Sequence, residues 1–165
     1  MLAQSLTPRL WQDIKSEYLD RIDKTLSNGN LFDAVHTHRV ESRVMELTQR
    51  NHCVFTTSGS SAILMTLMAY KIGPGDEVIC PNLSYVASAN QIPLLGAKPV
   101  FVDADEFGHI DVRQIESKVT TRTKAIMPVS LYGENYEHDS VMDIASRHNL
   151  IVIEDSAQSY NTMYK

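Results

Sequence analysis

Hydrophobic side chains recur at two different spacings along this chain, and the spacings predict its helices and strands. Residues 8–28 carry apolar side chains at helical spacing, namely Leu10, Ile14, Leu19, Ile22 and Leu26. A second amphipathic helix is expected at 38–50. The segment 60–72 is apolar nearly all round, which predicts a buried helix.

From residue 52 onward, short β-branched runs alternate with helical segments. We expect strands at 52–56, 77–81, 98–103, 124–130 and 150–155, and helices at 60–72, 85–95, 111–119 and 138–148. Apolar strands of this kind are typical of sheets that are covered on both faces. The pattern therefore predicts an α/β protein, with a three-layer α/β/α arrangement around a mainly parallel sheet.

Composition narrows the functional classes. The chain has 165 residues, a net charge of −5 and 43% hydrophobic residues, as expected for a globular protein of about one domain. The acidic balance and the absence of a basic motif argue against a nucleic-acid or anionic-membrane partner. Cys53 and Cys80 lie in apolar runs, which favours buried, reduced thiols. With no signal-peptide core and no run of ~18 uncharged residues, the sequence predicts a soluble cytoplasmic protein without a membrane contact.

The turn TTSGSS, residues 56–61, is a candidate phosphate site. In an open parallel sheet, ligands bind beyond the carboxyl ends of the strands. Gly59 permits close backbone approach, and Ser60 and Ser61 open a helix whose first N–H groups have no partners within the helix. The alternative, a serine N-cap with a glycine turn and no ligand, is favoured if the turn is considered alone. The turn fits neither classical dinucleotide nor nucleoside-triphosphate motifs.

Three further residues follow other expected strands. Tyr85 could stack on a planar ring or belong to the half-buried core. Asp155 could face a cationic ring nitrogen, or it could be an N-cap or a surface acid. Gln158 could bond a phenolic oxygen or be solvated. Taken together with the TTSGSS turn, these residues form the set that pyridoxal 5′-phosphate (PLP) requires.

Several longer motifs make the chain resemble a known family. They are TTSGSSAI, IGPGDEVICP, SYVASANQIPLLGAKPVFVDAD, TRTKAIMPVSLYG and VIEDSAQSY. In this order they resemble the DegT/StrS family of PLP-dependent sugar aminotransferases, which belongs to the fold type I, aspartate aminotransferase-like superfamily. The resemblance implies six cofactor-binding residues: Gly59, Ser60 and Ser61 at the phosphate, Tyr85 stacked on the ring, Asp155 at the ring nitrogen and Gln158 at the phenolic oxygen.

The family's Schiff-base lysine has no counterpart here. It belongs to a motif resembling SFxxxK, and Lys165 aligns ahead of that motif. Lys71, Lys98, Lys118 and Lys124 are expected at the wrong sheet edge or facing solvent. We therefore expect no catalytic residue in the chain. The resemblance implies an N-terminal helical segment at 1–50 and a truncated PLP-binding large domain at 51–165, without the C-terminal part and the small domain.

As a whole, the resemblance implies that the chain is the N-terminal part of an aminotransferase that acts on nucleotide-linked keto sugars with a glutamate-type amino donor. Such an enzyme would serve polysaccharide biosynthesis, and this part of it is expected to be inactive alone. Family members are homodimers, and residues 26–44 correspond to the region that meets the partner. The expected partner is thus a second copy or a companion chain that carries the C-terminal half. The alternatives are a non-catalytic assembly or ligand-binding protein that keeps the dimer surface and phosphate corner, a gene remnant, or the family's dehydratase variant.

No metal site is expected. His36 and His38 have the His-x-His form of a metal pair, but no cluster of carboxylates or cysteines supports it. Asp103 and Asp105 follow an expected strand, and a solvated acidic turn is favoured there over a divalent-ion site.

Overall fold

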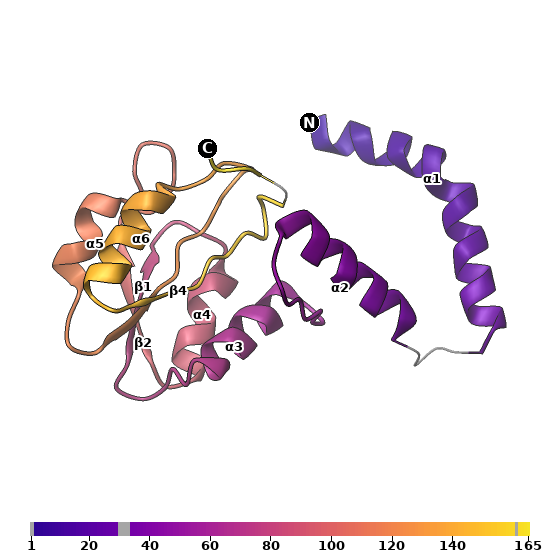
Figure 1. Ribbon diagram of the computed structural model, residues 1–165. Coiled ribbons are helices and arrows are strands. Elements are labelled where there is room, and N and C mark those ends of the chain that lie inside the picture. The colour runs from indigo at the N-terminus through magenta and orange to yellow at the C-terminus, as the bar shows by residue number, and fades with distance from the viewer. Residues whose placement is uncertain (1, 30–33, 161) are drawn as a thin grey trace. The chain divides into compact units, whose positions relative to one another are not determined.

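The computed structural model describes residues 2–29, 34–160 and 162–165, and its contacts divide the chain into two units. The first unit is Met1–Cys53 and the second is Val54–Lys165. The first contains two helices, α1 (Leu2–Ser27) and α2 (Val35–Thr48), which Figure 1 shows in indigo and purple. Both helices were expected from the apolar spacing, although each begins several residues earlier than predicted.

Helix α1 is amphipathic, and its apolar stripe is uncovered. Arg21 pairs with Glu17 at 2.6 Å and Lys24 pairs with Asp20 at 2.7 Å, one helical turn apart on the polar side. The apolar side chains of the described part of α1 are exposed, namely Leu10, Trp11, Ile14, Tyr18, Leu19, Ile22 and Leu26. Helix α2 contains no buried residue. None of the helices in the described part of the chain is long and apolar enough to cross a membrane.

The second unit is a parallel sheet between two layers of helices. Its strands are β1 (Glu77–Pro81), β2 (Lys98–Val102), β3 (Thr123–Ile126) and β4 (Ile151–Val152), in the order β2-β1-β3-β4. Its helices are α3 (Gly59–Ala69), α4 (Val86–Leu94), α5 (Val112–Lys118) and α6 (His138–Arg147). In Figure 1, α3 and α4 lie on one face of the sheet, and α5 and α6 on the other. The predicted three-layer α/β/α class is confirmed.

Alternating strand residues build one hydrophobic core on each face. Val78 and Cys80 of β1 pack with Leu67 of α3 and Ile92 of α4. Ile79, between them, faces the other way, where its cluster includes Ile115 of α5, Ile126 of β3 and Val141 of α6. Cys80 is a free thiol, and burial raises its pKa to about 12, as suits an unreactive core residue. Cys53 is also free but only partly buried.

The strand predicted at 52–56 is wrong. This segment has no regular secondary structure and pairs with no strand among the described residues, and Val54 is 72% exposed. A β-branched run becomes a strand only where a neighbouring strand accepts its backbone hydrogen bonds. The apolar pattern of 52–56 is therefore not sufficient to predict a strand.

Two other predicted strands are shorter than expected, at Thr123–Ile126 and Ile151–Val152. Their backbone pairing continues irregularly, because Ile153 N–H donates to Ile126 at 3.0 Å and Val129 bridges Asp155. The prediction that helix 60–72 is buried is also wrong in part. Only Leu67 of α3 is fully buried, whereas Met65 and Met68 are more than half exposed, because α3 is covered on one side only.

Candidate functional site

A pocket of about 380 Å³ lies at the carboxyl ends of the central strands. Strand β1 leads through α4 to β2 on one side, and β3 leads through α6 to β4 on the other. The gap between β1 and β3 is therefore a topological switch point, the usual ligand position in an open parallel sheet. The lining residues are Ser58, Gly59, Ser60, Ile63, Tyr85, Ala87, Val129, Leu131, Asp155, Ala157 and Gln158.

The N-terminus of α3 forms the polar corner of this pocket. Ser58 is the N-cap, and its Oγ accepts the backbone N–H of Ser61 at 3.1 Å. Within the described part of the chain, the N–H groups of Gly59 and Ser60 have no hydrogen-bond partner. These two groups and the positive end of the helix dipole form an anion site. The cap proposed from sequence as an alternative is present, and it leaves the anion site open.

Ser61 is the one predicted site residue that does not line the pocket. Its Oγ lies 3.1 Å from the hydroxyl of Thr57 and 3.0 Å from that of Ser58, so it belongs to the cap. Ser58 takes its place in the lining. The sequence did not distinguish the two serines because the helix was expected to begin at Ser60 and begins at Gly59.

Asp155 is held at the floor of the pocket from two sides. Its backbone N–H donates to Pro128 and its carbonyl accepts from Ser130, both at 3.0 Å. Its carboxylate accepts hydrogen bonds from Ser88 Oγ at 2.7 Å and from Ala157 N–H at 3.1 Å. The Asp155 carboxylate is therefore a fixed anionic group at the pocket, as a cationic ring nitrogen would require.

Gln158 is oriented by a strained turn. Its Oε1 accepts the backbone N–H of Tyr132 at 3.1 Å, which leaves the amide Nε2 to donate to another acceptor. Tyr132 has φ +58°, a left-handed conformation that is uncommon for a non-glycine residue, and Gly133 follows with φ +84°. This turn ends the motif TRTKAIMPVSLYG, and it holds Gln158.

Tyr85 is the N-cap residue of α4 and lines the pocket. It is 69% exposed, so the half-buried core position considered from the sequence is excluded. An exposed ring at the pocket rim is available to stack on a planar ligand.

The residues of this pocket fit PLP. An anion corner, an aromatic ring, a fixed carboxylate and an amide donor are the groups that a phosphorylated, cationic hydroxypyridine needs. The volume lies within the ~300–1,000 Å³ common for small-molecule sites. Five of the six predicted residues, Gly59, Ser60, Tyr85, Asp155 and Gln158, line the pocket together. Their binding of PLP remains a prediction.

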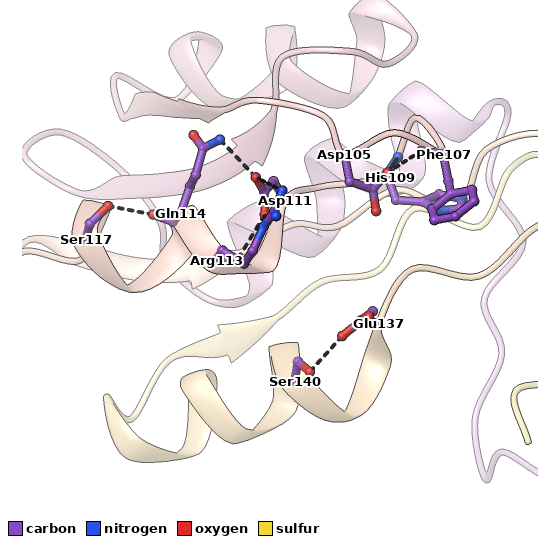
Figure 2. A network of polar contacts seen from close by, with 9 residues as sticks. All are labelled: Asp105, Phe107, His109, Asp111, Arg113, Gln114, Ser117, Glu137 and Ser140. Atoms are coloured by element: carbon purple, nitrogen blue, oxygen red, sulfur yellow. Dashed lines mark hydrogen bonds and ion pairs between the residues drawn. The ribbon is translucent and has the colours of Figure 1, made fainter.

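The acidic residues away from the pocket have structural partners. Asp105 accepts the N–H groups of Phe107 and His109 at 2.9 Å in a tight turn, as Figure 2 shows. In the same view Asp111 caps α5 and binds Arg113, whose guanidinium lowers the pKa of Asp111 to about 2. Asp103 accepts from Asn82 at 2.7 Å.

The histidines considered as a metal pair have separate neighbours. His36 Nε2 lies 3.2 Å from Thr25 Oγ1, and His38 Nδ1 lies 3.0 Å from Glu41. Among the described residues, no group of three or more potential ligands could hold a metal ion.

Comparison with known proteins identifies the family. A model of the DegT/DnrJ/EryC1/StrS aminotransferase family matches residues 12–165. The chain belongs to this family. The resemblance found in the motifs is thereby confirmed for nearly the whole chain.

Named relatives within the DegT/DnrJ/EryC1/StrS family include nucleotide-sugar enzymes. The chain is 40% identical over 153 residues to the UDP-2-acetamido-2-deoxy-3-oxo-D-glucuronate aminotransferase of Pseudomonas aeruginosa, covering 92% of this chain and 43% of that protein. It is 46% identical over 115 residues to the GDP-perosamine synthase of Caulobacter vibrioides, covering 69% of this chain and 31% of that protein. The chain thus spans less than half the length of these relatives.

The fold also matches solved structures. NtdA from Bacillus subtilis, crystallised with bound cofactor PMP, superposes with a TM-score of 0.87 at 32% identity. The match covers 90% of this chain and 34% of NtdA.

Proposed function

We propose that this chain forms the PLP-binding part of a sugar aminotransferase that acts on a nucleotide-linked keto sugar, with a glutamate-type amino donor. The observation that carries the proposal is the pocket at the switch point, where five of the six predicted cofactor residues meet. Two relatives named for reactions of nucleotide sugars support the substrate class. The cofactor-bound NtdA structure supports the cofactor class.

Each pocket residue has a role that follows from its chemistry. The free N–H groups of Gly59 and Ser60 would bind the phosphate. Asp155 would face the ring nitrogen and keep a proton on it, and Gln158 Nε2 would donate to the phenolic oxygen. Tyr85 would cover one face of the ring. When bound, PLP supplies an electron sink for the carbanion formed during amino transfer.

Among the residues that the structure describes, no lysine lines the pocket. Amino transfer on PLP needs a lysine that binds the cofactor and moves the proton. We therefore infer that the residues described here hold the cofactor without a covalent bond, and that the catalytic lysine is supplied by another part of the assembly. In this proposal a companion chain that carries the C-terminal half supplies the lysine, whereas a second copy of the chain, the other expected partner, brings the same lining without a lysine.

A non-catalytic ligand-binding or assembly protein is the second candidate. The same feature favours it, because the pocket lining provides binding groups but no proton-transfer lysine. The two candidates differ in whether amino-group transfer appears once a companion polypeptide is added.

Cofactor binding is tested directly by titrating the chain with pyridoxamine 5′-phosphate (PMP), which needs no lysine, and following ligand fluorescence. We expect saturable binding that Asp155→Ala weakens by about tenfold or more, since a charge-assisted hydrogen bond is lost. Asp13→Ala, which removes an exposed acid from α1, is the matched control and should bind like the parent chain. With PLP, borohydride should trap no stoichiometric adduct on a specific lysine. Absence of saturable PMP binding would exclude the proposed function for this chain.

A further inference from the structure

We propose that Ser88, supported by Ser84, is a positioning residue that fixes the Asp155 carboxylate toward a cationic ring nitrogen in the pocket; this rests on the proposed function. Ser88 does not line the pocket, so it would act only through Asp155. Sequence reasoning did not single it out, because its partner is 67 positions away and only the fold brings them together.

The geometry forms a short relay of hydroxyl groups. Ser88 lies in the first turn of α4 and is 1% exposed. Its Oγ donates to Asp155 Oδ2 at 2.7 Å, and it lies 2.9 Å from Ser84 Oγ. Because an ionised carboxylate only accepts hydrogen bonds, the hydroxyl hydrogen of Ser88 is donated to Asp155. Ser84 then donates to Ser88, and both hydroxyls point their protons toward the carboxylate.

Four other helical hydroxyls among the described residues bond within their own helix. The side chains of Thr25, Ser42, Thr48 and Thr66 each donate to the carbonyl four residues earlier, at 2.7–2.8 Å. That local bond is the usual way for a serine or threonine to satisfy its hydroxyl within a helix. Ser88 instead donates from α4 to Asp155 in the segment that follows β4, which indicates a role beyond satisfying its own hydroxyl.

The consequence is a carboxylate fixed in orientation as well as in place. Ser88 holds Oδ2, and the backbone N–H of Ala157 holds Oδ1 at 3.1 Å. Two donors on different oxygens restrict rotation about both side-chain torsions of Asp155. The remaining lone pairs are then presented in one direction, and a bound ring need not order the side chain itself.

The first experiment needs no ligand. Three-bond couplings from the Asp155 backbone to its carboxyl carbon report the side-chain torsion in the ligand-free 165-residue chain. We expect a single rotamer in the parent chain and rotamer averaging in Ser88→Ala. Ser88→Thr, which keeps the hydroxyl, should restore the single rotamer, and Ser42→Ala, which removes a hydroxyl bonded within its own helix, should change nothing. An unchanged single rotamer in Ser88→Ala would overturn the proposal.

The second experiment uses PMP as the probe. Ser88→Ala should bind PMP about tenfold more weakly, and the pH midpoint of the absorbance change of the bound ring should move to lower pH, because the ring proton has a less well-aligned partner. Ser88→Thr should recover both values. If Ser88 only stabilised the fold, Ser88→Ala would leave the pH midpoint unchanged, and Ser88→Thr would have no shift to reverse. If Ser88→Ala binds PMP with an unchanged pH midpoint, the positioning role is excluded.

The two proposals fail in distinguishable ways. A parent chain that binds no PMP contradicts the proposed function, while the torsion measurement still decides whether Ser88 orients Asp155. Should Ser88→Ala fold poorly because the site is buried, Ser84→Ala at the outer end of the relay replaces it. We expect Ser84→Ala to broaden the Asp155 rotamer distribution in the same direction but less, and an unchanged distribution would count against the relay.

Discussion

At the scale of single residues, Gly59 shows most directly how the fold leaves room for a ligand. A Cβ built at Gly59 would meet no atom within 4 Å, although the residue begins a helix and lines the pocket. The glycine is therefore not required by packing. Its value is the open space that it leaves in front of its own N–H group, where an anion can approach the backbone closely.

Gly59→Ala separates folding from binding. Alanine is the better helix former, so the variant should be as stable as the parent or more stable by ~0.5–1 kcal/mol. The added methyl group would occupy the phosphate corner and weaken PMP binding by about tenfold or more, about 1.4 kcal/mol. Urea unfolding and PMP fluorescence titration measure the two effects. Loss of stability, or full retention of affinity, would contradict this role for the glycine.

Glu77 is a buried carboxylate with several hydrogen-bond donors, at the opposite end of the sheet from the pocket. It is 1% exposed at the start of β1 and accepts hydrogen bonds from Thr120 at 2.6 Å and Arg122 at 2.7 Å. These bonds, the one from Thr120 first, lower the pKa of Glu77 from 4.5 to about 2. The buried charge thus ties β1 to the segment before β3.

The lowered pKa of Glu77 predicts an acid-sensitive contribution to stability. Between about pH 4.5 and about pH 2 the unfolded chain binds more protons at this residue than the folded chain, so stability falls as the pH falls. Glu77→Gln should be less stable at neutral pH and should lose less stability over that range. Unfolding midpoints measured across the range test this, with the exposed pair member Glu46→Gln as control. Parallel pH profiles for Glu77→Gln and the parent would contradict it.

At the scale of elements, the sequence predicted type and order well where contacts are local. The helices of the second unit and β1 follow from spacing and end residues, and β1 was placed at 77–81, where the structure has it. The segment 52–56 was predicted from the same kind of pattern and is not a strand, since strand formation depends on a partner distant in sequence. Apolar periodicity alone does not report whether that partner is available.

Helix α3 is covered by the core on one side only, and a matched pair of substitutions in this helix tests that arrangement. Leu67→Ala removes a fully buried side chain from the core against α4 and should cost about 2–5 kcal/mol of unfolding free energy. Met68→Ala, one position along, removes a side chain that is more than half exposed, and should cost less than about 0.5 kcal/mol. Urea denaturation of both variants measures the difference. Equal costs would show that Met68 is covered in solution.

At the scale of the whole molecule, the candidate site could be predicted in outline because the carboxyl ends of parallel strands share one edge. From the sequence, that rule predicts Gly59, Tyr85 and Asp155 close together, and they line one pocket. The rule did not predict that Ser58, rather than Ser61, lines the pocket. That difference depends on α3 beginning at Gly59, one residue earlier than expected. Nor did the rule give the Ser88 contact, which depends on how α4, packed against β1 and β2, lies relative to the segment that follows β4.

The uncovered apolar surface of each unit predicts self-association. Ile14 and Ile22 belong to the exposed stripe of α1, and Val54 and Phe55 are exposed in the second unit. Patches of this kind lower their free energy by meeting another apolar surface. Light scattering over a concentration series should give a mass of at least two chains for the parent. Joint replacement Ile14→Glu and Ile22→Glu should lower that mass, because charges on the stripe oppose its burial.

The matched control adds the same charges to the polar side of α1, as Gln12→Glu with Ser16→Glu. This variant should associate like the parent if the apolar stripe drives association. Equal dissociation of both double variants would instead assign the effect to net charge, since each adds two negative charges to a chain that already carries −5. A parent chain that stays monomeric at every concentration would exclude the stripe as a contact between copies. Light scattering of a mixture with a companion polypeptide would then test whether the stripe binds that polypeptide instead.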